Sequence, residues 1–285
     1  MIYLVIAIFF GSLFAILFKL FQQHGIDSLQ AIGVNYVVAA AIGVVGSVAQ
    51  EAQVVALGSW APWALVAGLF MMAGFVTMNY ATRWHGVAVS TIAARVAFVV
   101  PVLCAYLFLG SDEPQWLASV LVIVSLFLIF PSRGVVSSVS QRWFLPLLVF
   151  LSYGVANFML KYCQQLVAQA GGSDADLSLV SAFAFVAAIV FTMIYYFSLP
   201  SSQRQPFAWR NVWAGLVLGI VNMGCTYFLL KSLMVIDSAI FYPIYNISIV
   251  LIASVVGRWY FGERLSIQQY VGIIIALVAI VLFFK

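Results

Sequence analysis

The chain has 285 residues, of which 65% are hydrophobic and 7% are charged, and its formal net charge is +4. A soluble domain carries about 25% charged residues, so this composition excludes a globular surface covered by water. Spanning β-strands need alternating polarity, and the run 120–124 (Val-Leu-Val-Ile-Val) does not alternate. We therefore expect an all-α integral membrane protein, in contact with the lipid bilayer of a bacterial inner membrane.

Ten apolar stretches follow one another along the chain. A helix that crosses the hydrocarbon core needs about 20 apolar residues, and stretches of roughly this length are separated by short segments rich in Gly, Pro, Ser and Asp. The predicted helices cover residues 2–22, 28–49, 62–82, 86–109, 114–131, 143–168, 177–198, 211–233, 237–260 and 266–284. The loops left between them are too short to hold a soluble domain.

The order of polar residues in the first half returns in the second half. Lys19 corresponds to Lys161, 142 residues later, and Glu113 corresponds to Glu263, 150 residues later. Each half contains five predicted helices, and an odd number makes the second half enter the membrane from the opposite side. We expect a first five-helix repeat over residues 1–135 and an inverted second repeat over residues 136–285, around a central cavity.

Arg95 is the most informative charged residue, because it is expected near the middle of the fourth helix. A charge at that depth costs at least about 2.5–3.5 kcal/mol on insertion scales and commonly marks a substrate pathway. The sequence offers no acidic residue at a comparable depth, and a guanidinium suits carboxylate or phosphate groups. The alternative is an arginine satisfied by backbone carbonyls and Asn side chains, or one that extends toward the interface.

Further polar side chains fall on shared faces of the predicted helices. The sixth helix carries Tyr153, Asn157 and Lys161 at helical spacing, and such stripes could line a polar cavity with aromatic walls. The alternative is hydrogen bonding between helices, worth about 0.6 kcal/mol per contact. With Arg95, the candidate substrate-binding residues are Asn79, Tyr80, Asn157, Lys161, Asn222, Tyr242, Tyr245 and Asn246.

Two prolines, Pro101 and Pro243, lie inside the fourth and ninth predicted helices. Each removes a backbone donor and bends its helix, so each is either a hinge that controls access or a static bend. Gly215 and Gly219 form a Gly-x-x-x-Gly face that predicts close helix packing.

Enzyme signatures are absent from the sequence. It contains no HExxH motif, no phosphate-binding Gly-Lys-Ser/Thr loop and no apparent intramembrane Ser/His or Asp/Asp pair. The three cysteines lie far apart in apolar runs, which is typical of packing residues. We therefore expect no enzymatic activity, no cofactor, no metal and no nucleic-acid partner, and a monomer is plausible.

The strongest family resemblance is carried by three stretches of the second half. They are Ser238-Ala239-Ile240-Phe241-Tyr242-Pro243, Phe261-Gly262-Glu263-Arg264-Leu265-Ser266 and Gln268-Gln269-Tyr270-Val271-Gly272, and the first half matches more loosely from Ser90 through Pro101 to Glu113. This pattern resembles the ten-span, EamA-like branch of the drug/metabolite transporter superfamily. The resemblance implies ten helices in two inverted repeats around a central cavity, and alternating-access transport of small metabolites, often amino acids.

Three functions remain open from the sequence. The first is a secondary transporter of a small carboxylate-bearing metabolite, amino acids first, with Arg95 binding the carboxylate. The second is a translocator of phosphorylated sugars or nucleotide sugars, in which Arg95, Lys161 and Lys231 bind the phosphate. The third is a membrane protein that does not transport, either an enzyme acting on lipid or a packing partner.

Overall fold

A computed structural model describes residues 2–49, 52, 57–109, 116–129, 142–233 and 238–283. These residues form helices joined by short connections, and none of them belongs to a β-strand. Each of the ten predicted stretches is largely helical, with helix ends that differ from the predicted bounds by up to five residues and with α3 running through the third stretch into the fourth. The helices are α1 (Ile2–Gln23), α2 (Ser28–Ala49), α3 (Leu57–Val96), α4 (Val99–Leu109), α5 (Trp116–Ile129), α7 (Leu145–Gln169), α8 (Asp174–Ser198), the 3₁₀ turn η1 (Ser201–Gln203), α9 (Trp209–Leu233), α10 (Ser238–Trp259) and α11 (Ile267–Phe283).

Polar residues between the apolar runs begin the helices by satisfying their first N–H groups. The Oδ1 atom of Asp27 accepts a hydrogen bond from the Leu29 N–H group at 2.8 Å at the start of α2. At the start of α8, the backbone N–H group of Ser173 donates to Oδ2 of Asp176 at 2.9 Å, as part of a capping box. Such caps stabilise a helix by about 1 kcal/mol, so the predicted loops also fix where the helices begin.

The fourth predicted helix, over 86–109, is in fact two helical segments. The first, residues 87–96, follows a reversal of the chain at Gly86, whose φ of 87° favours glycine because it has no Cβ. The helix then breaks at residues 97–98 and resumes as α4. Pro101 has no N–H group to donate to Ala97, and the Val100 N–H group donates to the Ala97 carbonyl instead, at 3.1 Å. The predicted proline effect is therefore an interruption of the helix.

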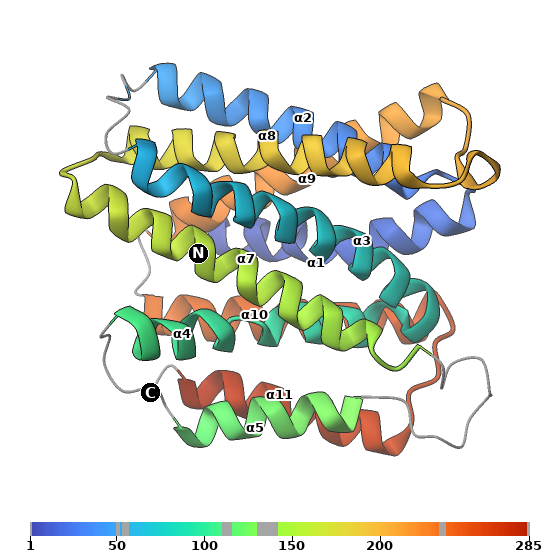
Figure 1. Ribbon diagram of the computed structural model, residues 1–285. Helices are drawn as coiled ribbons and strands as arrows, with labels where there is room; N and C mark the ends of the chain where they lie inside the picture. The colour runs from blue at the N-terminus through green and yellow to red at the C-terminus, as the bar shows by residue number, and fades with distance from the viewer. Residues whose placement is uncertain are drawn as a thin grey trace.

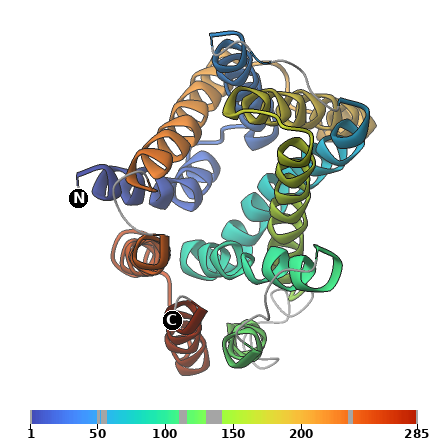
Figure 2. The ribbon, with the colours of Figure 1, turned by 90° about the vertical axis from the view of Figure 1, so that its left-hand side faces the viewer.

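The helices lie roughly side by side and the chain runs back and forth between the two ends of the bundle (Figure 1). α1 begins and α11 ends at the same end. α3 packs against α7 and α8, α2 packs against α8 and α9, and α1 packs against α9 and α10. α5 and α11 pack mainly on each other, at one edge of the bundle (Figure 2).

Aromatic side chains fill the largest cluster of buried residues. The Phe75 ring on α3 contacts the rings of Phe14, Phe18, Tyr36 and Tyr153, with centroids 5.5–6.4 Å apart. The Tyr36 hydroxyl donates to the Met71 carbonyl at 2.7 Å, so its polar end is satisfied inside the core. These contacts join α1, α2, α3 and α7 around one ring.

Small residues let pairs of helices approach closely. A Cβ atom added at Gly215 would lie 2.5 Å from the Cβ atom of Val34, and one at Gly219 would lie 2.8 Å from that of Val38. This confirms the predicted close packing, which joins α9 to α2. A Cβ atom at Gly68 on α3 would collide with the backbone of Ala184 on α8.

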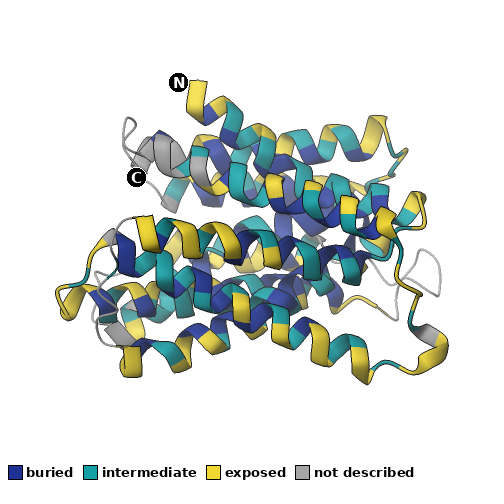
Figure 3. Ribbon diagram, turned by 90° about the horizontal axis from the view of Figure 1, so that it is seen from above, coloured by how far each residue is buried: buried dark blue, intermediate teal, exposed yellow. Residues whose placement is uncertain are grey.

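Large apolar side chains cover the outer faces of the helices, where exposed residues gather in Figure 3. Val48, Ile194 and Ile220 are each more than half exposed. Five helices among the described residues are long and apolar enough to cross a membrane, which is compatible with an integral membrane protein. The predicted repeat boundary after residue 135 and the side chain of Glu113 lie outside the described residues.

Trp60 is buried, although its place at the end of an apolar run predicts a position at the membrane interface. A tryptophan at the end of an apolar run predicts an anchor at the membrane interface, as for Trp259, which is 85% exposed. Trp60 is instead 1% exposed and packs on Phe183, with ring centroids 5.7 Å apart. The cause is that α3 begins at Leu57, five residues before its predicted start, so Trp60 lies inside the helix packing.

Candidate functional site

Arg95 lies in the last turn of the 87–96 segment, next to the interruption of the helix. Its Nη2 atom donates a hydrogen bond to the carbonyl oxygen of Gly11 at 3.0 Å. Its guanidinium carbon lies 5.2 Å from the centroid of the Tyr245 ring, within the range of a cation–π interaction. The side chain is partly exposed. Arg95 therefore joins α3 to α1 and α10, and a planar cation is held inside the bundle.

The close approach of α1 to α10 determines where the partners of Arg95 lie. A Cβ atom at Gly11 would lie 2.6 Å from Cδ1 of Ile249 and 2.7 Å from the hydroxyl oxygen of Tyr245. Only glycine fits this gap without a shift of its neighbours. The Tyr245 hydroxyl also lies 3.0 Å from Sγ of Cys225 on α9. Asn246, the next residue, is buried.

Tyr153 on α7 links Arg95 to a row of polar side chains. It lies near Arg95, and its hydroxyl donates to the sulfur atom of Met78 at 3.2 Å. Asn157 and Lys161 follow at four and eight residues, as predicted for one helical face. Both are exposed and both line a cavity. The row thus runs from the level of Arg95 outward along α7.

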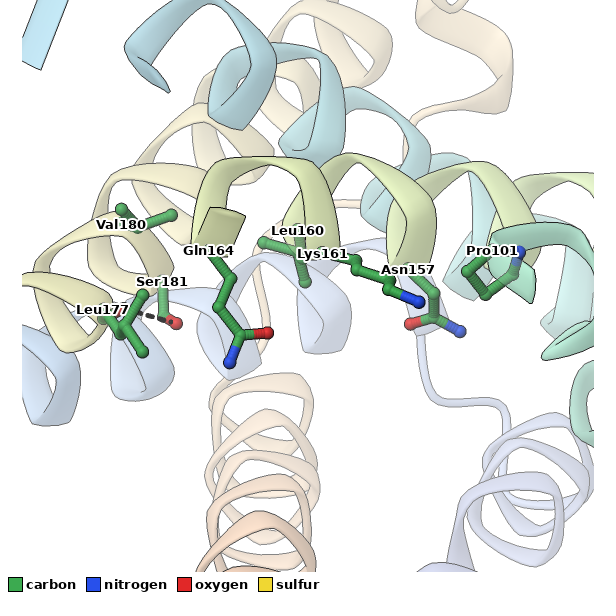
Figure 4. A pocket seen from close by; sticks show the side chains of 8 residues that line it. All are labelled: Pro101, Asn157, Leu160, Lys161, Gln164, Leu177, Val180 and Ser181. Carbon is green, nitrogen blue, oxygen red and sulfur yellow. Dashed lines mark hydrogen bonds between the residues drawn. The ribbon is translucent and has the colours of Figure 1, made fainter. Parts of the chain in front are cut away.

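The cavity has a volume of about 410 Å³ and lies between α4, α7 and α8 (Figure 4). This volume is in the range of about 300–1,000 Å³ that is usual for small-molecule sites. One charged group, uncharged polar groups and aliphatic side chains share its wall, and none of the described residues that line it carries a carboxylate. The lining residues are Pro101, Asn157, Leu160, Lys161, Gln164, Leu177, Val180 and Ser181.

Gln164 and Ser181 were not predicted to line a site. Gln164 lies three residues after Lys161, so helical spacing alone could have included it. Ser181 is on α8, where its hydroxyl donates to the Leu177 carbonyl at 3.0 Å. Its polar neighbour at helical spacing, Ser178, lies near Gly46 on α2, so periodicity did not indicate that Ser181 lines the cavity.

The remaining predicted residues do not gather at Arg95. Asn79 accepts hydrogen bonds from Nε2 of Gln22, through its carbonyl oxygen at 2.7 Å and its side-chain oxygen at 3.0 Å. With Tyr80 and Tyr195 it lines a separate pocket of about 30 Å³. Asn222 donates to Oδ1 of the buried Asn35 at 3.2 Å, joining α9 to α2. The side chains of Tyr242 and Pro243 lie outside the described residues.

A charged cluster lies at the opposite end of the bundle from the cavity. The Lys19–Glu263 cluster consists of Lys19, Gly86, Val87, Gly257 and Glu263. The Nζ atom of Lys19 lies 3.4 Å from Oε1 of Glu263, and both oxygens of that carboxylate accept from the Val87 N–H group at 2.9 Å. The sequence marked Lys19 and Glu263 as repeated residues but gave them no functional role.

Comparison with known proteins gives the fold a precedent but no function. No known protein family matches the chain by its sequence profile. An uncharacterized protein of Haemophilus influenzae is 26% identical to it over 289 residues, covering 97% of this chain and 95% of that protein. A protein of known crystal structure superposes with a TM-score of 0.58 at 12% identity, covering 99% of this chain and 94% of the other. The whole chain therefore shares its fold with a protein of known structure.

Proposed function

We propose that this chain is a secondary transporter that moves a small carboxylate-bearing solute, amino acids first, by alternating access, as its resemblance to drug/metabolite transporters implies. The observation that carries the proposal is a guanidinium inside an apolar bundle, near a cavity whose described lining residues include no carboxylate. The cation and its partners would bind the solute carboxylate, and the aliphatic wall would accept its apolar part.

The state of Arg95 supports a binding role. Its described partners are the Gly11 carbonyl, the ring and hydroxyl of Tyr245 and the nearby Tyr153, all of them neutral groups, so its charge meets no carboxylate among the described residues. A carboxylate could form two parallel hydrogen bonds with the guanidinium. This bidentate interaction is stronger than the single hydrogen bond to the Gly11 carbonyl. Substrate binding would then release α1 from Arg95.

The packing of helices supports two related halves. Suppose that α1 exchanges with α7, α2 with α8, the first part of α3 with α9, and α4 with α10. Three main contacts then map onto three others: α2·α9 onto α8·α3, α1·α9 onto α7·α3, and α1·α10 onto α7·α4, while the α1·α3 contact has no such counterpart among the described residues. The α2·α8 and α5·α11 contacts map onto themselves. α1 ends at the same end of the bundle where α7 begins, so the two run in opposite directions (Figure 1).

Two pairs of glycine contacts follow the same exchange. Gly11 faces Ile249, and Gly154 faces Val100, where an added Cβ would lie 2.5 Å from Cγ2. Residues 11 and 154 are 143 apart, and residues 100 and 249 are 149 apart, within the offsets of 142–150 found in the sequence. The close approaches of Gly68 to α8 and Gly215 to α2 form a second such pair. These contacts favour an inverted repeat, an architecture on which many alternating-access transporters are built.

Arg95→Ala is the direct test. Purified protein in liposomes is preloaded with unlabelled amino acids, and exchange is measured with a mixture of radiolabelled L-amino acids. We expect loss of exchange in Arg95→Ala, with partial activity in Arg95→Lys, which keeps the charge but not the planar fork. Arg83→Ala, an exposed arginine on the same helix, is the matched control. Unchanged exchange by Arg95→Ala would remove Arg95 from the site.

A phosphorylated solute is the second candidate, because the cavity wall also carries the ammonium group of Lys161. Lys161 lies on the same face of α7 as Tyr153, so a substrate with a second anionic group could meet both cations. Lys231, the third predicted cation, has its side chain outside the described residues. Competition by inorganic phosphate separates the candidates: it should inhibit exchange of a sugar phosphate and leave amino-acid exchange unchanged.

A further inference from the structure

The Lys19–Glu263 cluster joins three separate parts of the chain at one end of the bundle. Lys19 comes from the last turns of α1, Val87 begins the helical segment that follows Gly86, and Glu263 lies in the connection between α10 and α11. Besides its ion pair with Glu263, Lys19 donates to the Thr82 carbonyl at 3.4 Å. One carboxylate and one ammonium thus hold together segments that are 68–244 residues apart.

The carboxylate of Glu263 occupies a space that two glycines leave open. A Cβ atom at Gly86 would lie 2.5 Å from Cδ of Glu263, and one at Gly257 would lie 2.6 Å from its Oε2. The carboxylate also meets the first N–H group of the 87–96 segment, where the positive end of the helix dipole favours an anion. The Glu263 side chain is 12% exposed and the Lys19 side chain 20%. Solvent therefore has little access to the pair.

At the other end of the bundle the corresponding lysine is exposed. Lys161, the counterpart of Lys19 in the second half, is exposed and lines the cavity of about 410 Å³. Just inside the Lys19–Glu263 cluster the packing is closed. Ser90 is fully buried, its hydroxyl donates to the Gly86 carbonyl at 2.7 Å, and it lies 3.0 Å from the Thr82 hydroxyl. A large cavity thus opens toward one end of the bundle, whereas at the other end the described side chains around Ser90 are closely packed.

α1 connects the two ends. Arg95 at the end of the 87–96 segment binds the Gly11 carbonyl, and Glu263 joins the beginning of the same segment to Lys19, eight residues further along α1. Two turns of α1 are therefore fixed to the segment at both of its ends. A group that displaces Gly11 from Arg95 removes one of these two attachments.

We propose that the Lys19–Glu263 cluster is the gate that closes this end of the transporter, and that it opens when a bound solute releases α1 from Arg95. The proposal rests on the alternating-access function above. Glu263 has two separable tasks in it. Its charge holds Lys19, and its oxygens cap the Val87 N–H group, so Glu263→Gln loses the first task and keeps an acceptor for the second.

Accessibility of a cysteine at position 90 tests the gate without any solute. The native cysteines are replaced in the full-length chain (C104A, C163A, C225S), Ser90→Cys is added, and labelling by a hydrophilic maleimide is timed in detergent. We expect Lys19→Ala and Glu263→Gln each to speed labelling about tenfold or more, which corresponds to about 1.4 kcal/mol in the opening equilibrium. The double variant should match the single variants, because both remove one interaction.

Two controls separate opening from other effects. Gln23→Ala removes an exposed polar side chain one turn further along α1 and should leave labelling unchanged. A second reporter, Ala276→Cys, is fully buried where α11 faces α5; unfolding would expose it, whereas opening of the gate would not. Labelling at position 90 that stays within twofold of the background in both Lys19→Ala and Glu263→Gln overturns the gate. Because no solute is involved, this result is independent of the transport assay for Arg95.

Discussion

Gly11→Ala tests whether the geometry around Arg95 matters beyond the packing of helices. The added methyl group would lie 2.6 Å from Cδ1 of Ile249 and 2.7 Å from the hydroxyl oxygen of Tyr245. Cδ1 ends a flexible side chain and can move. The Tyr245 ring is rigid and 2% exposed, so its hydroxyl cannot move without shifting the ring that faces Arg95.

The expected loss of stability follows from two opposing terms. Overpacking a core costs about 1–3 kcal/mol, and Gly→Ala in a helix regains up to about 1 kcal/mol. The free energy of unfolding should therefore fall by about 0–3 kcal/mol. Gly154→Ala is the matched control, because its methyl group would lie 2.5 Å from Cγ2 of Val100 and involves no contact of Arg95.

The two variants are compared by thermal unfolding in detergent and by exchange of radiolabelled amino acids in liposomes. We expect similar losses of stability but a much larger loss of exchange in Gly11→Ala. The double variant Gly11→Ala/Tyr245→Phe removes the oxygen that the methyl group meets. It should therefore be more stable than the sum of the single effects by about 1 kcal/mol, a coupling typical of residues in contact.

Additivity of Gly11→Ala and Tyr245→Phe to within about 0.5 kcal/mol would refute the reasoning, since it would mean that the methyl group and the hydroxyl do not meet. Equal loss of exchange in Gly11→Ala and Gly154→Ala would also refute it, because the position of Tyr245 would then have no special effect on the site.

Two further variants test the packing and the helix interruption. Gly68→Ala should lower the melting temperature more than Gly11→Ala, because its methyl group meets the backbone of α8. Gly58→Ala is the control and should not lower the melting temperature, because there is open space around Gly58. Equal melting temperatures for the Gly68 and Gly58 variants would contradict the close approach of α3 and α8. Pro101→Ala restores a backbone donor and should raise the melting temperature while slowing exchange, since a continuous helix bends less readily. An unchanged rate of exchange would show that the interruption is only a static bend.

The positions of the helices could be predicted from the sequence because apolar length and loop composition determine them locally. Asp27 and Ser173 begin their helices where the loops predicted a break. The beginning of α3 could not be predicted, since Pro62 suggested a start there while packing of Trp60 on α8 extends the helix by one turn. The break after residue 96 also escaped prediction, because a proline indicates a bend but not how the backbone around it rearranges.

The candidate site was only partly predictable, and distance along the chain explains the difference. Asn157 and Lys161 share a face of one helix, so their periodicity predicts that both line the same cavity. Asn79 and Arg95 lie on different segments, and the local sequence does not indicate that Asn79 accepts hydrogen bonds from Gln22 in place of lining the cavity. The pairing of Lys19 with Glu263 spans 244 residues and depends on the fold of the whole chain.

The interruption of the helix at residues 97–98 has an electrical consequence. A helix end leaves its last carbonyls, and the next helix its first N–H groups, without partners inside the helix. The oriented peptide dipoles then place partial negative charge at the end of the 87–96 segment and partial positive charge at the beginning of α4. A zwitterion carries its ammonium and its carboxylate on one carbon. Its two charges are complementary to these two helix ends, the ammonium to the end of the 87–96 segment and the carboxylate to the beginning of α4.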